Sequence, residues 1–316
     1  MSSAENTVSH FLPAGDYSLD ATLSSGQVFR WRRREEAWEG VVGNRWVRLA
    51  QTRGGLHAEA MDGDGEWQWL IGFLQVEVDL KAVQGQWPDD PPLRAAAARW
   101  PGLRLLNQRP WECLASFILS SNKQIVQIHQ MVDELCRRYG VPVRAPAGAG
   151  PAHAFPAAAS LAACSEADLR ACGLGFRAPY LRETARRVAQ AEIDLDGLRR
   201  LPVQEARRRL EGLPGVGRKI ADCVLLFALD FSEVFPVDVW VEKALRRWYF
   251  AGRQPTRRCL MQFAERHFGP QGGYAQQYLF HAARLGSDRS GNDWPAGGTA
   301  NNELATAVSR GFPTVQ

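Results

Sequence analysis

Long apolar runs are missing from this sequence of 316 residues. No stretch approaches the roughly 20 apolar residues that a membrane-spanning helix requires, which argues against a transmembrane protein. The first ten residues, MSSAENTVSH, also lack the basic and then apolar layout of a secretory signal peptide. We therefore expect an intracellular protein that does not bind membranes.

Closely spaced cysteines are missing as well. The sequence has six cysteines and no Cys-x-x-Cys pair, whereas zinc sites and iron–sulfur clusters require such pairs or similarly tight groups. We therefore expect no iron–sulfur cluster, no catalytic metal, and thiols that remain reduced. The six cysteines are Cys113, Cys136, Cys164, Cys172, Cys223 and Cys259.

A large excess of charge of one sign is also absent, because the formal net charge is only +4. This mildly basic balance permits nucleic-acid binding but is equally typical of many other proteins. The length is sufficient for two ordinary domains, each with a buried core. Composition therefore limits the class of protein, and the motifs must indicate the function.

Two patterns of apolar residues divide the chain. From Tyr17 to about Leu56, short alternating stretches such as YSLDATL, VFRWRRR and RWVRLAQ are separated by turn residues, which predicts strands. Beyond Pro110, apolar residues recur every three or four positions, as in CLASFILSSNKQIVQIHQMVDELCRRYG, which predicts helices. Residues 141–159 are rich in Pro, Ala and Gly, which predicts a loop. The Gly- and Asn-rich C-terminal end is expected to be disordered.

The most informative segment is LPGVGRKIAD, residues 213–222, which lies between two helical stretches. Pro214 turns the chain, while Gly215 and Gly217 allow positive φ and a close approach of backbone N–H groups to a ligand. The amides of Gly215, Val216 and Gly217, at the N-terminus of a helix, would form a phosphate site. An ordinary turn between two helices is the alternative.

Together with the downstream residues VFPVDVW, this segment resembles the hairpin and the aspartate-ending loop of the helix-hairpin-helix DNA glycosylase superfamily. In that superfamily, a lysine just after the hairpin marks members that also cleave the DNA strand, and an aspartate in the Pro-Val-Asp stretch is required throughout. The resemblance places these residues at Lys219 and Asp238. It therefore implies a bifunctional glycosylase/lyase that acts on double-stranded DNA.

The chemistry of base excision accounts for both residue types. A neutral lysine amine attacks C1′ of the damaged nucleotide, releases the base and leaves a Schiff base, which leads to β-elimination and strand scission. A carboxylate stabilises the positive charge that develops on the sugar as the glycosidic bond breaks. The alternatives are a solvated lysine on a helix face for Lys219 and a helix N-cap for Asp238, which precedes the helical run VWVEKALRRW.

Four further stretches are similar to the 8-oxoguanine DNA glycosylase family, and the resemblance extends from about residue 15 to about residue 290. In LSSGQVFRW, residues 23–31, Gly26 corresponds to a family glycine whose carbonyl accepts a hydrogen bond from N7–H of 8-oxoguanine. Undamaged guanine has an acceptor at N7 instead, so the same carbonyl repels it. The alternative is that Gly26 only forms a turn.

The stretch PWECLASFILSSNKQIVQI, residues 110–128, resembles the family segment whose asparagine fills the gap left by the extruded base. Asn122 corresponds to that asparagine, which also contacts the orphaned cytosine. A surface or helix-end asparagine is the alternative. A family arginine that helps to read the cytosine corresponds to Gln127, which cannot act as a charged fork. The strictness of the preference for cytosine therefore stays open.

The stretch CGLGFRAPYL, residues 172–181, is similar to a family segment that contacts DNA on both sides of the lesion. There an aromatic residue wedges beside the lesion, and an arginine contacts the opposite base. These roles correspond to Phe176 and Arg177. A core position for Phe176, and a phosphate contact or a surface charge for Arg177, are the alternatives.

The stretch YAQQYLFHA, residues 274–282, matches a family helix that holds the extruded base. Gln276 corresponds to a glutamine that binds the Watson–Crick edge, and Phe280 to a phenylalanine that stacks on the base. The resemblance adds Cys223, on the opposite face of the base, and Phe227 to this pocket. Ordinary core packing is the alternative for Phe280 and Cys223.

Trp240 departs from the family, which has a histidine there that contacts a phosphate near the lesion. The indole N–H still donates one hydrogen bond but carries no charge. We therefore expect the affinity for DNA, or its pH dependence, to differ from that of better-known members.

Three other functions fit the sequence less well. A noncatalytic DNA-binding module would have no use for Lys219, Asp238 or the base pocket. A monofunctional alkylbase glycosylase would lack the lysine after the hairpin. An enzyme of the endonuclease III type would carry four clustered cysteines after the aspartate, and these are absent. The residues therefore favour base-excision repair of 8-oxoguanine.

The resemblance implies an α+β protein of two domains. Residues 1–107 would form an N-terminal antiparallel sheet domain, TATA-binding-protein-like, packed on a mostly α-helical helix-hairpin-helix domain of residues 108–288. Residues 289–316 would form the disordered tail. No cofactor is expected to be required, although a monovalent cation between the hairpin carbonyls and a DNA phosphate is a family property. We expect a monomer that binds duplex DNA containing 8-oxoguanine, in the cytoplasm or the nucleoid if the organism is a bacterium.

Overall fold

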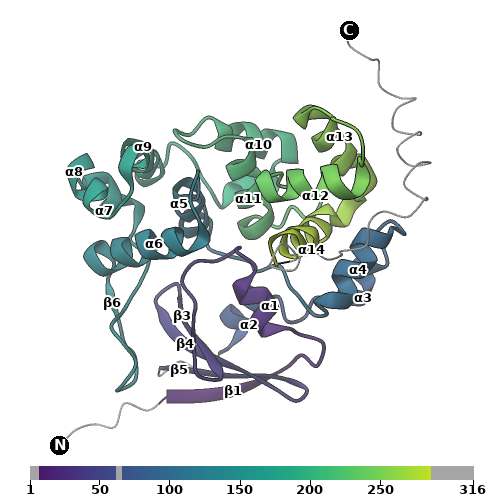
Figure 1. Ribbon diagram of the computed structural model, residues 1–316. Helices are drawn as coiled ribbons and strands as arrows, with labels where there is room; N and C mark the ends of the chain where they lie inside the picture. The colour runs from purple at the N-terminus through teal and green to yellow at the C-terminus, as the bar shows by residue number, and fades with distance from the viewer. Residues whose placement is uncertain (1–6, 62–65, 286–316) are drawn as a thin grey trace, which may run out of the picture. The chain divides into compact units, whose positions relative to one another are not determined.

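The computed structural model describes residues 7–61 and 66–285, which form an α+β fold (Figure 1). The chain falls into two compact units, and each is described by itself. The first unit contains Met1–Val78 and Gly102–Asp230, and the second contains Asp79–Pro101 and Phe231–Gln316. The predicted antiparallel sheet and mostly helical remainder are confirmed. The C-terminal tail that was predicted to be disordered lies outside the described residues.

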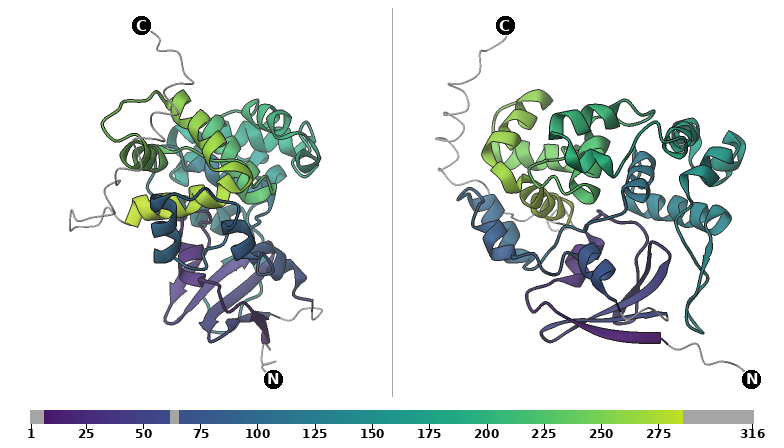
Figure 2. Two further views of the ribbon diagram at one scale, coloured as in Figure 1. Left: turned by 90° about the vertical axis from the view of Figure 1, so that its right-hand side faces the viewer. Right: turned by 180° about the vertical axis from the view of Figure 1, so that it is seen from behind.

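The sheet of the first unit has five antiparallel strands in the order β1-β5-β4-β3-β2. Figure 2 shows the ribbon from two further sides. The strands are β1 (Thr7–Pro13), β2 (Arg32–Arg34), β3 (Ala37–Val42), β4 (Arg45–Thr52) and β5 (Gly55–Met61). Register places Leu49 of β4 opposite Ala58 of β5, and both side chains are fully buried. They belong to an apolar core that also contains Leu12, Tyr17 and Leu56. The alternating apolar residues therefore predicted the strand β4, whereas β5 lies almost wholly beyond the stretch that was expected to form strands.

The prediction of a strand around residues 17–24 was wrong, because Leu19–Ser24 is a helix, α1. Ser18 caps it, since its side chain accepts a hydrogen bond from the Ala21 N–H, and Leu19 and Leu23 are buried. Seven residues of YSLDATL are too few for alternation to distinguish a strand from a helix with one buried face. The following stretch VFRWRRR contributes only Arg32–Arg34 to the sheet.

The remaining elements of the first unit are mostly helical. They are α2 (Gln68–Leu74), α5 (Pro110–Leu119), α6 (Ile125–Tyr139), α7 (Ala158–Ala163), α8 (Glu166–Ala171), η1 (Gly175–Arg177), α9 (Ala178–Ala189), η2 (Gly197–Arg200), α10 (Val203–Glu211) and α11 (Arg218–Ala228). The stretch expected to be a loop, residues 141–159, contains a short hairpin of β6 (Pro142–Val143) and β7 (Ala152–His153) and the start of α7. Two-residue strands are too short for a periodic signal, which is why the sequence did not predict them.

The second unit is helical and joins two distant parts of the sequence. Its elements are α3 (Leu80–Gln84), α4 (Pro91–Arg99), α12 (Val239–Tyr249), α13 (Arg257–His267), η3 (Gly269–Gln271) and α14 (Gly272–Leu285). Asp90, which is 1% exposed, caps α4 by accepting the Leu93 N–H at 2.8 Å. It also accepts the Tyr249 hydroxyl at 3.1 Å and contacts His267 Nε2 at 2.9 Å. This carboxylate therefore holds α4 against α12 and α13.

Candidate active site

The predicted turn between two helices is present in the first unit. The Val216 N–H donates to the Leu213 carbonyl at 3.1 Å and closes the turn between α10 and α11. Gly215 has a φ of 76°, a conformation that favours glycine. Gly217 precedes the first residue of α11 in extended backbone, and both glycines are exposed. The amide of Val216 is thus used inside the turn.

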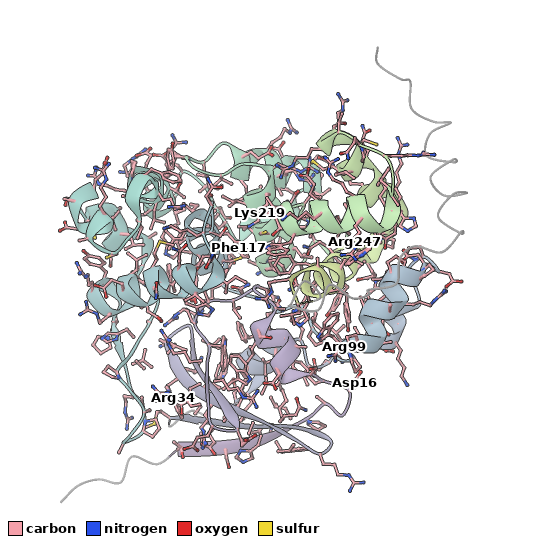
Figure 3. All side chains as sticks on the ribbon, in the orientation of Figure 1. Asp16, Arg34, Arg99, Phe117, Lys219 and Arg247 are labelled. Carbon is pink, nitrogen blue, oxygen red and sulfur yellow. The ribbon has the colours of Figure 1, made fainter. Side chains whose placement is uncertain are left out.

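Lys219 is the second residue of α11 and is half-buried. Its Nζ lies 3.2 Å from Ser120 Oγ and 5.0 Å from the centre of the Phe117 ring (Figure 3). The alternative of a freely solvated lysine on a helix face does not fit, because the amine of Lys219 contacts a hydroxyl and the face of an aromatic ring. The sequence did not predict either contact. The local signal that points to Ser120 is the turn sequence Ser-Ser-Asn directly after α5.

A buried carboxylate joins the two helices that flank the turn. Asp222, 2% exposed, accepts hydrogen bonds from Arg207 Nε of α10 at 2.6 Å and from Arg218 Nε of α11 at 2.8 Å. Burial raises the pKa of Asp222, and the two guanidinium groups oppose that rise. Because Arg218 directly precedes Lys219, this cluster fixes the start of α11. No local pattern in the sequence indicates this cluster.

The turn between α5 and α6 carries Asn122, which is exposed and has a φ of 53°. Asparagine tolerates this left-handed conformation better than most residues. Gln127 is also exposed, and its Oε1 accepts the Gln124 N–H at 3.2 Å at the start of α6. Gln127 thus has a structural role as part of a helix cap, which the sequence analysis missed.

Phe176 and Arg177 occupy different environments, although they are neighbours in η1. Phe176 is 56% exposed, so it is not a core residue, whereas Arg177 is 3% exposed, so it is not a surface charge. Arg177 donates to the carbonyls of Ser121 and, at 3.3 Å, Leu174, and its guanidinium lies 4.2 Å from the centre of the Phe176 ring. Burial lowers the pKa of Arg177. Arg177 therefore stabilises the turn that carries Asn122, through its bond to the carbonyl of the preceding residue.

Gly26 lies in a turn after α1 and has a φ of 80°. The next residue, Gln27, is fully buried and fixes this turn. Its Nε2 donates to the Arg104 carbonyl and its backbone carbonyl accepts Gln108 Nε2, both at 2.8 Å. The Gln108 N–H in turn donates to the Phe227 carbonyl at 2.8 Å. The Gly26 turn is therefore connected to α11, the helix that carries Lys219.

Cys223 and Phe227 lie on α11 and are 3% and 4% exposed. The Phe227 ring stacks on the Phe117 ring with a centroid separation of 5.6 Å, so the ring beneath the Lys219 amine belongs to an aromatic stack. The six cysteines, all of them within the described residues, are free thiols in the structure. Among the described residues, no group of three or more His, Cys, Asp or Glu side chains is placed to hold a metal. No helix in the described ranges is long and apolar enough to cross a membrane.

Asp238 and Trp240 belong to the second unit. Asp238 caps α12, because its Oδ1 accepts the Trp240 N–H at 3.0 Å and the Val241 N–H at 2.8 Å. The N-cap considered as an alternative is thus present, which leaves the catalytic role a separate question. The Trp240 side chain is half-buried, and Lys243 Nζ lies 5.2 Å from the centre of its ring.

Helix α14 carries Gln276 and Phe280. Gln276 is 4% exposed, and its Oε1 has no hydrogen-bond partner among the described residues. Phe280 is half-buried, with the Arg284 guanidinium 5.9 Å from its ring centre. The next residue, His281, is 1% exposed and lies edge-on to Trp100 at 5.1 Å. The half-buried position of Phe280 does not fit ordinary core packing.

The buried imidazole of His281 makes the stability of the fold depend on pH. Burial, and then Arg284, lower the pKa of His281 from 6.5 to about 4. Between these values the unfolded chain binds a proton that the folded chain does not, so stability is lost as pH falls from 6.5 towards 4. In urea unfolding, we expect the wild type to lose about 2 kcal/mol more than His281→Gln between pH 7 and pH 5. Equal losses in the two proteins would contradict this assignment.

Comparison with known protein families gives two adjoining matches. Residues 10–114 match the model of the 8-oxoguanine DNA glycosylase N-terminal domain. Residues 115–270 match the model of HhH-GPD superfamily base excision DNA repair proteins. Together the two matches span both the sheet and the hairpin.

Individual relatives match most of the chain. The "Probable N-glycosylase/DNA lyase" of Methanothermobacter thermautotrophicus is 32% identical over 86% of this chain and 95% of its own length. The N-glycosylase/DNA lyase OGG1 of Arabidopsis thaliana is 32% identical over 84% of this chain and 77% of its own. A crystal structure of Clostridium acetobutylicum 8-oxoguanine glycosylase/lyase with double-stranded DNA containing cytosine opposite 8-oxoguanine has a TM-score of 0.81. It is 30% identical and covers 86% of this chain and 93% of that one.

Proposed function

Because the chain belongs to the 8-oxoguanine DNA glycosylase family, we propose that it excises 8-oxoguanine from duplex DNA with Lys219 as the nucleophile. It is an N-glycosylase/DNA lyase of base excision repair. The observation that carries the residue assignment is the position of Lys219, which follows the exposed Gly215 and Gly217 and has its amine against Ser120. An amine fixed in this way has lost much of the freedom that attack on one carbon would otherwise cost.

In the proposed reaction, neutral Lys219 attacks C1′ and the glycosidic electron pair leaves with the base, which takes up a proton. The C1′–O4′ bond then breaks as the nitrogen forms its double bond to C1′, and O4′ takes up a proton that the amine releases. β-elimination from this Schiff base expels the 3′ phosphate and cleaves the strand. Asp238 stabilises the positive charge on the sugar as the bond to the base breaks. The two amides that bind its Oδ1 support this role, because they fix the orientation of the carboxylate.

Recognition of the base is assigned to Gly26, Cys223, Phe227, Gln276 and Phe280. The carbonyl of Gly26 would accept N7–H, and Gln276 would bind the Watson–Crick edge. The partnerless Oε1 of Gln276 supports this assignment, because an unsatisfied buried acceptor costs about 1–3 kcal/mol, which a donor on the base would recover. The half-buried Phe280 would stack on the base.

Contacts with the rest of the DNA are assigned to the hairpin and to the turns beside it. The amides of Gly215 and Gly217 would bind a phosphate, with Val216 between them closing the turn, and Trp240 would donate one bond to the backbone. Asn122 would fill the gap left by the base, and the exposed Phe176 would wedge beside it. Arg177 holds the turn of Asn122, and the contact with the opposite base that is assigned to it would require its guanidinium, 3% exposed here, to become accessible when DNA binds.

Several finer properties belong to the same proposal. They are a monovalent cation at the hairpin, a monomeric state, an intracellular location in the nucleoid of a bacterium, and a domain boundary near residue 107. The exposed hairpin glycines support the cation, because nothing on their Cα atoms would keep it from the carbonyls.

A duplex with a single 8-oxoguanine tests the proposed function. With borohydride present, we expect a covalent complex between the wild type and this duplex, and none with an undamaged G·C duplex. Release of free 8-oxoguanine should accompany it. If the wild type neither forms the complex nor releases the base, the proposed function is wrong.

The base opposite the lesion tests the role of Gln127. A bidentate arginine–base contact contributes about 1–3 kcal/mol of discrimination, and Gln127 lacks that fork. We therefore expect excision rates opposite C, A, G and T to fall within about tenfold, and Gln127→Arg to raise the preference for C by about tenfold. The control is Gln127→Ala, which also loses the bond to Gln124 but adds no charge. A wild-type preference for C of several hundredfold would contradict this prediction.

A further inference from the structure

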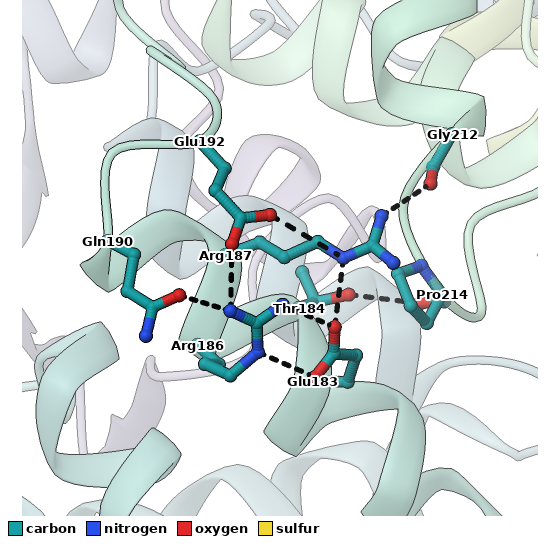
Figure 4. Close-up of polar contacts among 8 residues, drawn as sticks. All are labelled: Glu183, Thr184, Arg186, Arg187, Gln190, Glu192, Gly212 and Pro214. Carbon is teal, nitrogen blue, oxygen red and sulfur yellow. Dashed lines mark hydrogen bonds and ion pairs between the residues drawn. The ribbon is translucent and has the colours of Figure 1, made fainter.

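One face of α9 contacts the hairpin between α10 and α11 at three consecutive points. Thr184 Oγ1 donates to the Pro214 carbonyl at 3.0 Å, and Arg187 Nη1 donates to the Gly212 carbonyl at 3.1 Å (Figure 4). A Cβ on Gly215 would lie only 2.8 Å from the Cβ of Tyr180, so backbone and ring are in close contact there. Tyr180, Thr184 and Arg187 are four and three residues apart, which places them on one side of the helix. We call these three residues the α9 stripe.

The charged end of the α9 stripe is itself held in place. Arg187 Nε donates to Glu183 Oε1 at 3.0 Å, and Glu192 lies 4.0 Å away on the other side. Arg186 also binds both carboxylates, as Figure 4 shows. Arg186 and then Arg187 hold the pKa of Glu183 at about 2, so this carboxylate stays ionised at neutral pH. The guanidinium of Arg187 is therefore oriented towards the hairpin before DNA arrives.

The bond from Thr184 sets the direction of one particular amide. Thr184 is fully buried, so its hydroxyl has few other places to point. The carbonyl of Pro214 and the N–H of Gly215 belong to the same planar trans peptide and point in opposite directions. Because Thr184 holds that carbonyl towards α9, the Gly215 N–H points away from α9. Gly215 itself has no side chain that could hold the peptide in place, and glycine is the most flexible residue.

The other end of α9 reaches the residues assigned to the lesion. η1 (Gly175–Arg177), with Phe176 and Arg177, runs directly into the first residue of α9. Arg177 is bound to the Ser121 carbonyl beside Asn122. The ten residues from Ala178 to Arg187 span about 14 Å of helix, and a helix of this length is a stiff spacer. One rigid element therefore connects the wedge with the hairpin.

We propose that Thr184 and Arg187 are positioning residues for DNA binding, which fix the Gly215 amide at a set distance from Phe176 and Asn122. The inference rests on the proposed function, because it takes the hairpin as the phosphate site. These residues act through the backbone of the hairpin and do not touch the reacting atoms. Their loss weakens binding of the duplex and leaves the chemical step at saturating DNA intact.

The test compares Thr184→Val with Thr184→Ser in the full chain on a duplex with one 8-oxoguanine. We expect Thr184→Val to raise Kd about tenfold, because the isosteric side chain has lost the donor, and to keep the single-turnover rate at saturating duplex within about twofold of wild type. Thr184→Ser keeps the hydroxyl and should restore Kd. An unchanged Kd in Thr184→Val, or a slower single-turnover rate with normal Kd, would overturn the proposal.

Loss of stability is separated from loss of positioning by a matched control. Leu181→Ala removes buried volume from the same helix without touching the hairpin carbonyls. It should lower the melting temperature and leave Kd unchanged, and a rise of Kd equal to that of Thr184→Val would refute the inference. If Thr184→Val does not fold, Arg187→Met replaces it, with an expected rise in Kd of about threefold and an unchanged Kd as the refuting result. If the wild type forms no covalent complex, the result contradicts the proposed function and not the positioning role of Thr184 and Arg187.

Discussion

Lys219→Gln forms no covalent complex with an 8-oxoguanine duplex in borohydride, and its excision rate falls by roughly 10³-fold or more. An amide nitrogen is not a nucleophile, so neither attack at C1′ nor the Schiff base is available to it. The glutamine side chain keeps N–H donors near Ser120 Oγ, the partner of the lysine amine, although it is one bond shorter than lysine. The variant should therefore fold and bind the duplex, so that the loss is confined to the chemistry.

Other lysines provide the control, because the chain has only Lys81, Lys123, Lys219 and Lys243. Lys81 is exposed on α3 and has no assigned role. Lys81→Gln should form the covalent complex at the wild-type rate, and mass spectrometry of the trapped wild type should place the adduct on the peptide that contains Lys219. An adduct on a different lysine, or trapping that survives in Lys219→Gln, would remove Lys219 from the mechanism.

Asp238→Asn slows excision by roughly 10²-fold and changes the affinity for the duplex by less than about threefold. A neutral amide does not stabilise the positive charge on the sugar. Asparagine caps a helix as well as aspartate does, so its oxygen can still accept the Trp240 and Val241 amides. Single-turnover kinetics at saturating DNA would measure the loss of rate, and urea unfolding should show nearly unchanged stability.

Two further variants separate the cap from the carboxylate. Asp238→Ser keeps a capping oxygen without a charge and should be as slow as Asp238→Asn. Asp238→Ala loses the cap as well, which should cost about 1 kcal/mol of stability in addition to the same loss of rate. Wild-type turnover in Asp238→Ser would reduce Asp238 to a helix cap.

Local signals in the sequence predicted the elements that depend on near neighbours. The turn before α11, the cap at Asp238 and the alternation in β4 each rest on residues within a few positions of one another. The interpretation of residues 19–24 as a strand shows the limit of such signals. A short helix and a short strand can be formed by the same pattern of apolar residues. In this segment, only Ser18 at the N-cap position favours the helix.

The contacts that position the candidate residues could not be predicted, because they join distant parts of the chain. Ser120 and Lys219 are 99 residues apart, and Gln27 and Gln108 are 81 apart. The compact units show the same effect, since α4 lies in one unit with helices that follow residue 230. Local sequence patterns predict only domains made of one continuous segment. Units such as these arise from packing between segments that are remote in sequence. Gln127 is a further case. The resemblance to the family showed that it lacks the charge of an arginine, but not that its Oε1 accepts the Gln124 N–H.

The hydroxyl of Ser120 has a consequence for the electron pair of the Lys219 amine. A serine has one proton to give, and Ser120 directs it to the Phe117 carbonyl at 2.7 Å. Towards Lys219, at 3.2 Å, it therefore offers only its oxygen lone pairs. A neutral amine in this place donates an N–H to the serine, so the serine leaves the lone pair of the amine available for attack on a carbon atom. A water at the same position, free to turn its proton around, would bind that lone pair.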